Sequence, residues 1–346
     1  MDRIFNPEML KLIRQVKGLN QKDFCEKAQI TQGTLSKLEQ GLYPPNEDLI
    51  NDLAINLHVP SDFFYQKGEM YPPSTPLHRS KSTLRKRYKD RVEALANIYR
   101  IHMNKLLDAV EIDFKIPQIN KTTPKMAAIL TRQNLRMPYG AVKNMTELLE
   151  KNGVFVFFLD FESEEIDGFT IFGDGIHPLI FINNSFPGDR VRFTLAHELG
   201  HIVMHYIKDG EESLEQEANE FASEFLMPEN EIKKSLTYIN LQKLINLKRQ
   251  WKVSMNALLK RATDLKTLTY SQSRYLWMQM ASKGYRKQEP VLIPVEKSTL
   301  IKELIDLHFK ELEYTKQEIC KLLCLYEDDF DKYYNFGNIR LKIVRE

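Results

Sequence analysis

The sequence is poor in cysteine and lacks a long apolar run, and both absences narrow the class of protein. Only three cysteines occur in 346 residues, at Cys25, Cys320 and Cys324, so the odd, sparse set argues against a disulfide framework and for a reducing compartment. The longest strongly apolar run, residues 154–159, is far too short to cross a bilayer. The first ten residues lack the apolar segment of a signal peptide. We therefore expect a cytoplasmic protein with no membrane partner.

The charge balance also lacks a dominant sign. The formal net charge is +2, which by itself does not indicate a nucleic-acid-binding protein. Any DNA-binding function must therefore come from a local pattern of residues.

Turn-forming segments divide the chain into predicted domains. Residues 68–76 and 117–125 contain several prolines and interrupt helical patterns. Three short β-rich runs lie at 154–159, 169–172 and 178–183. We expect an α+β fold that is mainly α, with a short sheet in one domain. The predicted domains are a small all-α domain at 1–70, a basic helical linker at 71–125, a mixed domain at 126–290 and a helical C-terminal region at 291–346.

A metal-binding pattern occurs in the segment RFTLAHELGHIVMH, where His197, Glu198 and His201 form H-E-x-x-H. Residues four apart lie on one face of a helix, so the two imidazoles can bind one metal ion. Glu198 projects about 100° around the helix from His197. This direction favours a role for Glu198 as a general base and not as a metal ligand. Gly200 is costly inside a helix and indicates that another element packs closely there.

A catalytic zinc ion needs a third protein ligand, and residues 214–228 form a second amphipathic helix that can supply it. Glu215 lies at the edge of the apolar face, where a carboxylate needs a partner. Glu217 projects away with Glu220 and Glu224 and is expected to be solvated. Asn219, one turn after Glu215, is expected to orient a metal ligand through a hydrogen bond.

Two alternatives accompany the metal site. His205 lies one turn beyond His201 and either supports the metal site or substrate cleft, or is an ordinary packed histidine. The whole pattern could also be two solvated helices with incidental histidines. The ordered occurrence of a histidine pair, a central glutamate and an inward glutamate favours the metal site.

These residues resemble a known family. PLIFINNSFPGDRVRFTLAHELGHIVMH, EQEANEFASEFLMP and LINLKRQWKVSMNALLKRA are similar to segments of the ImmA/IrrE zinc metallopeptidases. The resemblance implies a zincin-like peptidase domain, a Zn²⁺ ion bound by His197, His201 and Glu215, and Glu198 as general base. Because members of the family cleave helix-turn-helix repressors, it also implies a protein substrate.

Two features of the peptidase site stay open at this point. The strand at 178–183, just before the H-E-x-x-H helix, is either an edge strand that pairs with an extended substrate or a structural core strand. The group that stabilises the oxyanion is one of Tyr206, His205 and Arg192.

Residues 8–65 resemble the lambda-repressor-like helix-turn-helix family, through IRQVKGLNQKDFCEKAQITQGTLSKLEQGLYPPNEDLINDLAINLHVPSDFF. The resemblance implies a first motif helix at 21–28 and a recognition helix, capped by Thr31, that enters the major groove of double-stranded DNA. A helical module that binds protein is the alternative. The expected DNA-contacting residues are Gln21, for a phosphate, and Gln32, Thr34, Ser36 and Lys37, on the exposed face of the recognition helix.

Two charged segments flank these motifs. Residues 79–91 carry seven lysines and arginines against Asp90, and form either a phosphate-binding patch or, as we favour, a solvated linker helix. Residues 209–224 are acidic without an intervening base, so a basic substrate segment is expected.

Three functions follow from these patterns. The first is a regulatory protease that cuts a repressor or antitoxin-like protein. The second is a transcriptional regulator whose metal site does not hydrolyse. The third is a toxin–antitoxin or phage-defence component. The presence of Glu198 favours hydrolysis, and a second copy of the chain is a further candidate partner.

Overall fold

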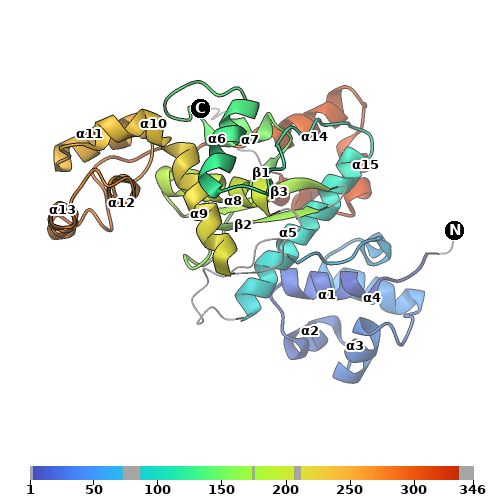
Figure 1. Cartoon of the computed structure of the whole chain (residues 1–346). Helices are drawn as coiled ribbons and strands as arrows, with labels where there is room; N and C mark the ends of the chain where they lie inside the picture. The colour runs from blue at the N-terminus through green and yellow to red at the C-terminus, as the bar shows by residue number, and fades with distance from the viewer. Residues whose placement is uncertain (1–2, 73–85, 174–175, 206–211, 335–346) are drawn as a thin grey trace, which may run out of the picture. The chain divides into compact units, whose positions relative to one another are not determined.

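The computed structural model describes residues 3–72, 86–173, 176–205 and 212–334. The chain forms two compact units (Figure 1). Of the described residues, the first unit contains 3–72, 86–111 and 300–334, and the second contains 112–173, 176–205 and 212–299. The C-terminal helices therefore belong to the same unit as the N-terminal helices.

Short, capped helices build the first unit. The side chains of Asn20 and Thr31 accept backbone N–H groups at the starts of α2 and α3, which stabilises helices too short to persist alone. The described elements of this unit are α1 (Pro7–Val16), α2 (Gln21–Ala28), α3 (Gln32–Glu39), α4 (Glu47–Leu57), η1 (Ser61–Tyr65), α5 (Lys86–Leu107), α14 (Leu300–Lys310), α15 (Lys316–Leu323) and α16 (Glu327–Tyr333).

Helix α5 is not the solvated linker helix expected from its charge. Its residues Ala94, Ile98 and Ile101 belong to the same apolar core as α1–α4. Only the start of the helix is strongly basic, and residues 79–85 of the basic segment lie outside the described residues. The described residues of the basic segment, 86–91, are exposed or half-buried, and the expectation of a solvated helix was wrong beyond them, because α5 buries an apolar face there.

The second unit contains a three-stranded sheet. Its strands are β1 (Phe155–Leu159), β2 (Gly168–Gly173) and β3 (Ile176–Asn183), in the order β1-β3-β2. Strand β3 pairs in parallel with β1 and antiparallel with β2. It is therefore the central strand, and its interpretation as an edge strand was wrong. The four consecutive buried residues from Leu179 to Ile182 are typical of a strand covered on both faces.

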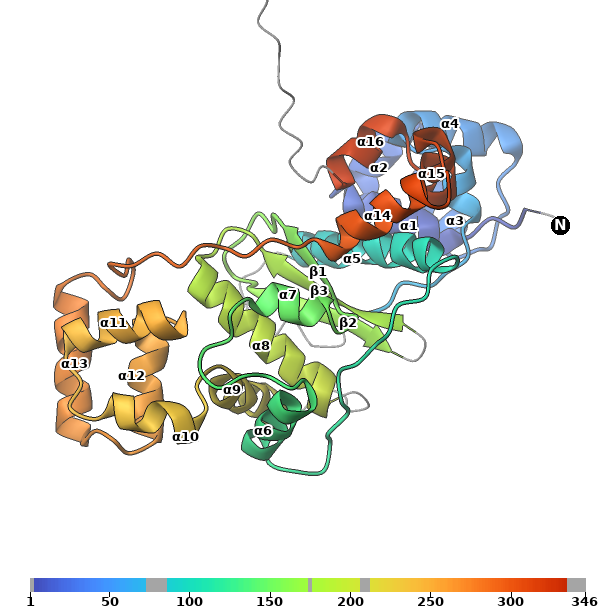
Figure 2. The same ribbon diagram turned by 90° about the horizontal axis from the view of Figure 1, so that it is seen from above.

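Helices cover the sheet and carry the predicted metal-binding pattern. Helix α8 (Gly188–Met204) packs against β2, β3 and α9 (Glu212–Leu226), as Figure 2 shows. None of the helices in the described part of the chain combines the length and apolar character needed to span a bilayer. The other described elements of this unit are α6 (Pro124–Asn134), α7 (Met145–Glu150), α10 (Glu229–Ile232), η2 (Lys233–Leu236), α11 (Leu241–Trp251), α12 (Met255–Asp264) and α13 (Tyr270–Ser282).

Candidate functional site

Close packing between α8 and α9 positions the H-E-x-x-H pattern. A methyl group added at Gly200 would lie 3.1 Å from the Phe221 ring and 3.3 Å from the Cα of Ala218. Both contacts come from α9, so the sequence-based expectation of a close neighbour is confirmed. The small residue lets the two helices approach until side chains from both reach the same point.

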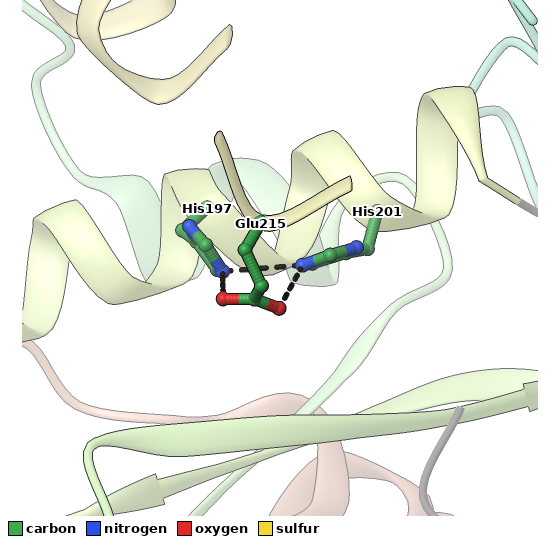
Figure 3. Close-up of side chains that lie close together, drawn as sticks. All are labelled: His197, His201 and Glu215. Carbon is green, nitrogen blue, oxygen red and sulfur yellow. Dashed lines mark hydrogen bonds and ion pairs between the residues drawn. The ribbon is translucent and has the colours of Figure 1, made fainter. Parts of the chain in front are cut away.

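Three side chains converge at this point (Figure 3). Nε2 of His197 lies 3.1 Å from Nε2 of His201. The carboxylate oxygens of Glu215 lie 3.4 Å from His197 Nε2 and 3.3 Å from His201 Nε2. Helix α8 supplies both histidines and α9 supplies the glutamate, so the structure brings the three predicted ligands together.

The spacing of these donor atoms fits a zinc ion. Ligand atoms about 2.0–2.1 Å from zinc in tetrahedral geometry are about 3.3–3.4 Å apart, close to the three separations observed. Partial burial raises the pKa of the Glu215 carboxyl, but hydrogen bonds and charge from His197 and His201 outweigh burial and lower the pKa overall. Glu215 is therefore a carboxylate at neutral pH, as metal binding requires.

Hydrogen bonds on the far side of each imidazole orient the Nε2 atoms. Nδ1 of His197 lies 3.2 Å from Oδ1 of Asn219, whose amide donates to the Glu215 carbonyl. Nδ1 of His201 lies 3.0 Å from Nδ1 of His205. When His197 and His201 each carry a proton on Nδ1, both present an Nε2 lone pair to the metal position.

Glu198 follows the predicted ligand His197 on α8 but does not belong to the group of converging side chains. It is 3% exposed, and the Thr170 hydroxyl donates a 2.7 Å hydrogen bond to its Oε2 atom. Thr170 comes from β2 and is fully buried. Sequence reasoning missed this residue, because a threonine in a β-rich run is ordinary and nothing in its spacing links it to Glu198.

Of the acidic residues of α9 expected to be solvated, Glu224 is buried, whereas Glu217 is partly exposed but has a partner. Glu224 is 2% exposed and forms an ion pair with Arg261. Glu217 contacts His205 with a 2.9 Å separation between carboxylate oxygen and Nε2. Two of the charges that led to the expectation of a basic substrate segment therefore have partners within the protein, and the expectation itself stays a prediction.

The structure describes two of the three side chains that were candidates for stabilising the oxyanion. The Arg192 side chain is buried and binds Glu296 and the Val142 carbonyl, so its guanidinium has a structural role. His205 contacts His201 and Glu217. Tyr206 lies outside the described residues.

A second group of possible metal ligands, His58, Asp328 and Asp329, occurs in the first unit. Asp328 is more than half exposed, and the Lys332 ammonium lies 3.1 Å from Asp328 and 2.9 Å from Asp329. Because this cation already balances the carboxylates, the group is a surface ion-pair cluster.

The helix-turn-helix segment folds with the predicted helix boundaries. Helix α2 spans Gln21–Ala28, and the Thr31 side chain caps α3. Gln32 and Lys37 are exposed on α3, while Leu35 and Leu38 are fully buried. The face expected to meet DNA is therefore polar and accessible.

The remaining predicted DNA contacts already have partners inside the protein. The Thr34 hydroxyl lies 2.9 Å from that of Thr31, and the Ser36 hydroxyl accepts from Gln40 at 3.0 Å. The Gln21 amide donates to Glu39 at 3.3 Å. Gln32 and Lys37 are thus the side chains of this set that the structure leaves most accessible, and all five contacts stay predictions.

Comparison with known protein families identifies the same two regions. Residues 149–263 match a peptidase family described as the IrrE N-terminal-like domain. Residues 10–64 match a helix-turn-helix family. No curated protein matches the chain.

Proposed function

We propose that this chain, which joins a helix-turn-helix domain to an IrrE-like peptidase domain, is a cytoplasmic DNA-binding zinc metallopeptidase. Its substrate is a repressor or antitoxin-like protein. The observation that supports hydrolysis is the convergence of His197, His201 and Glu215, together with the buried carboxylate of Glu198, which directly follows His197 on α8. A purely structural zinc site has four protein ligands, whereas a catalytic site has three and leaves one position open.

The metal ligands, Glu198 and Thr170 have different roles in the proposed hydrolysis. A Zn²⁺ ion held by the three ligands would lower the pKa of water and polarise a substrate carbonyl. Glu198 accepts the proton of the attacking water and delivers it to the leaving amine. Thr170 holds the Glu198 carboxylate in one orientation through the hydrogen bond to Oε2.

The substrate-binding strand of this proposal is β2 and not β3. In the sheet order β1-β3-β2, β2 lies at an edge, where an extended peptide can add as a further strand. Thr170 lies on β2 and contacts Glu198. A substrate segment bound along β2 therefore passes beside the general base.

The test uses an inactive Glu198→Gln protein as a trap. This variant keeps the three ligands, so it is expected to retain stoichiometric zinc and to hold its substrate uncut. A protein captured by the variant counts as substrate only when the parent chain cleaves it and a chelator stops the cleavage. A parent chain purified without zinc that gains none from zinc buffer would contradict the proposal.

A further inference from the structure

Positive charge is concentrated in one part of the second unit. Residues 232–288 contain thirteen lysines and arginines, and Asp264 is the only acidic residue among them. Since the whole chain has a net charge of only +2, the rest of it is negatively charged. This segment comprises η2, α11, α12 and α13, and the three α-helices contact one another (Figure 2).

Two of the thirteen bases have an internal role. Lys248 is buried and lies 2.5 Å from Asp189 of α8 and 2.7 Å from Glu289. Arg261 is buried and pairs with Glu224 of α9. These ion pairs attach α11 and α12 to the two helices that carry the candidate metal ligands, so the basic segment is anchored to the peptidase domain.

Most of the other bases lack a carboxylate partner. Lys233 pairs with Glu229 and Lys260 with Asp264, and the nine that remain have no acidic group within 4.0 Å among the residues that the structure describes. Seven of these nine are exposed, Arg249, Arg274 and Lys283 among them. Uncompensated like charges destabilise a compact state, so a surface of this kind indicates an anionic partner.

Exposed aromatic side chains accompany the charge. Tyr270 is 80% exposed and Tyr275 is 57% exposed, and Arg274, four residues after Tyr270, lies on the same side of α13. Lysine, arginine and tyrosine are all groups that contact phosphates of duplex DNA. The charged side chains are spread over three helices and the segment after α13, which matches a long array of phosphates better than a single acidic side chain or helix.

We propose that α11–α13 with their connections, here called the basic surface, bind the phosphate backbone of duplex DNA. This contact is separate from α3 and needs neither the metal nor hydrolysis. It does not read sequence, because phosphate contacts carry no direct sequence information. Its effect is to hold the peptidase domain on DNA, close to other DNA-bound proteins.

The test measures DNA affinity of the full chain carrying Gln32→Ala and Lys37→Ala, which weakens the expected contribution of α3. In this background, Arg249, Lys266, Arg274, Lys283 and Lys287 are changed to Gln. A matched control changes five exposed lysines elsewhere to Gln, Lys115, Lys121, Lys151, Lys302 and Lys321, and therefore has the same net charge. Fluorescence anisotropy with a duplex of random sequence is recorded over a range of salt concentrations.

The basic-surface variant is expected to bind at least about tenfold more weakly at about 0.1 M salt, with a salt slope reduced by about 0.9 for each phosphate that is no longer neutralised. The control is expected to change far less. Equal reductions of affinity in both variants would show that only net charge matters and would overturn the proposal. Polyglutamate that competes better than DNA of equal charge would also overturn it, in favour of an acidic protein partner.

Discussion

The Glu217 carboxylate lies 2.9 Å from Nε2 of His205, although Glu217 is not a member of the ligand group. Nδ1 of His205 in turn lies 3.0 Å from Nδ1 of His201. With a proton on His205 Nε2 donated to Glu217, the Nδ1 atom of His205 can accept the proton of His201 Nδ1. This chain of hydrogen bonds fixes the tautomer of His201 that presents Nε2 to the metal.

Replacing Glu217 is therefore expected to weaken zinc binding without removing a ligand. Glu217→Ala should lower zinc affinity about 10–100-fold, the usual effect of removing a group that orients a ligand histidine, and Glu217→Gln should recover part of it. Glu220→Ala is the matched control, because Glu220 is exposed on the same helix and accepts a hydrogen bond from Gln216. Competition with a chromophoric chelator measures the affinities, and equal values for Glu217→Ala and Glu220→Ala would exclude this role.

Ligand and general-base variants should separate metal binding from hydrolysis. Glu215→Ala is expected to lose zinc during dialysis against a weak chelator and to lose cleavage with it. Glu198→Gln is expected to retain zinc and to lose about 10²–10⁴-fold in rate, the usual contribution of a general base. Zinc analysis and cleavage of the trapped substrate check both. Retention of zinc by Glu215→Ala would show that Glu215 is not a ligand.

Thr170 offers a test of how Glu198 is held. Thr170→Val removes the hydroxyl that donates to Glu198 but keeps a β-branched side chain of similar size. Cleavage is expected to fall about tenfold, the rate effect of about 1.4 kcal/mol, which is close to the lower end of the usual range for a hydrogen bond to a charged group. Zinc content should not change. A variant with full activity would mean that Glu198 needs no support from β2.

The recognition helix should control sequence discrimination. Gln32→Ala and Lys37→Ala are expected to reduce the preference for an operator, selected from random DNA, over a scrambled duplex. A good base contact contributes about 1–3 kcal/mol of discrimination. The five basic-surface changes to Gln, made in a chain that keeps Gln32 and Lys37, should weaken binding to both duplexes by the same factor. If these five changes abolished discrimination while Gln32 and Lys37 were intact, the assignment of sequence reading to α3 would fail.

The first unit should lose stability in acid. Burial, with the Lys105 ammonium nearby, lowers the pKa of His102 to about 3, while an unfolded histidine titrates near 6.5. Between these values the unfolded chain binds a proton that the folded chain does not. The free energy of unfolding therefore falls as pH drops below about 6.5, by at most about 1.4 kcal/mol per pH unit. Urea unfolding should show a shallower pH dependence for His102→Gln, and identical curves would contradict the assignment.

Local sequence determined the helices that carry both candidate sites. The caps at Asn20 and Thr31 define the starts of α2 and α3, because a side-chain acceptor satisfies backbone N–H groups there and nowhere else nearby. The spacing of His197 and His201 likewise follows from helical geometry alone. Gly200 also indicated that another element packs against α8, because glycine is costly inside a helix unless close packing requires it.

Only the tertiary structure decided which group occupies each direction around these helices. Helical periodicity placed Glu217 and Glu224 away from the metal, but it did not give their partners. Glu217 contacts His205, and Glu224 contacts Arg261, which lies 37 residues further along the chain. The support of Glu198 by Thr170 and the central place of β3 depend in the same way on strand order. Periodicity gives the direction of a side chain within one element, whereas its partner is set by packing with residues far away in the sequence.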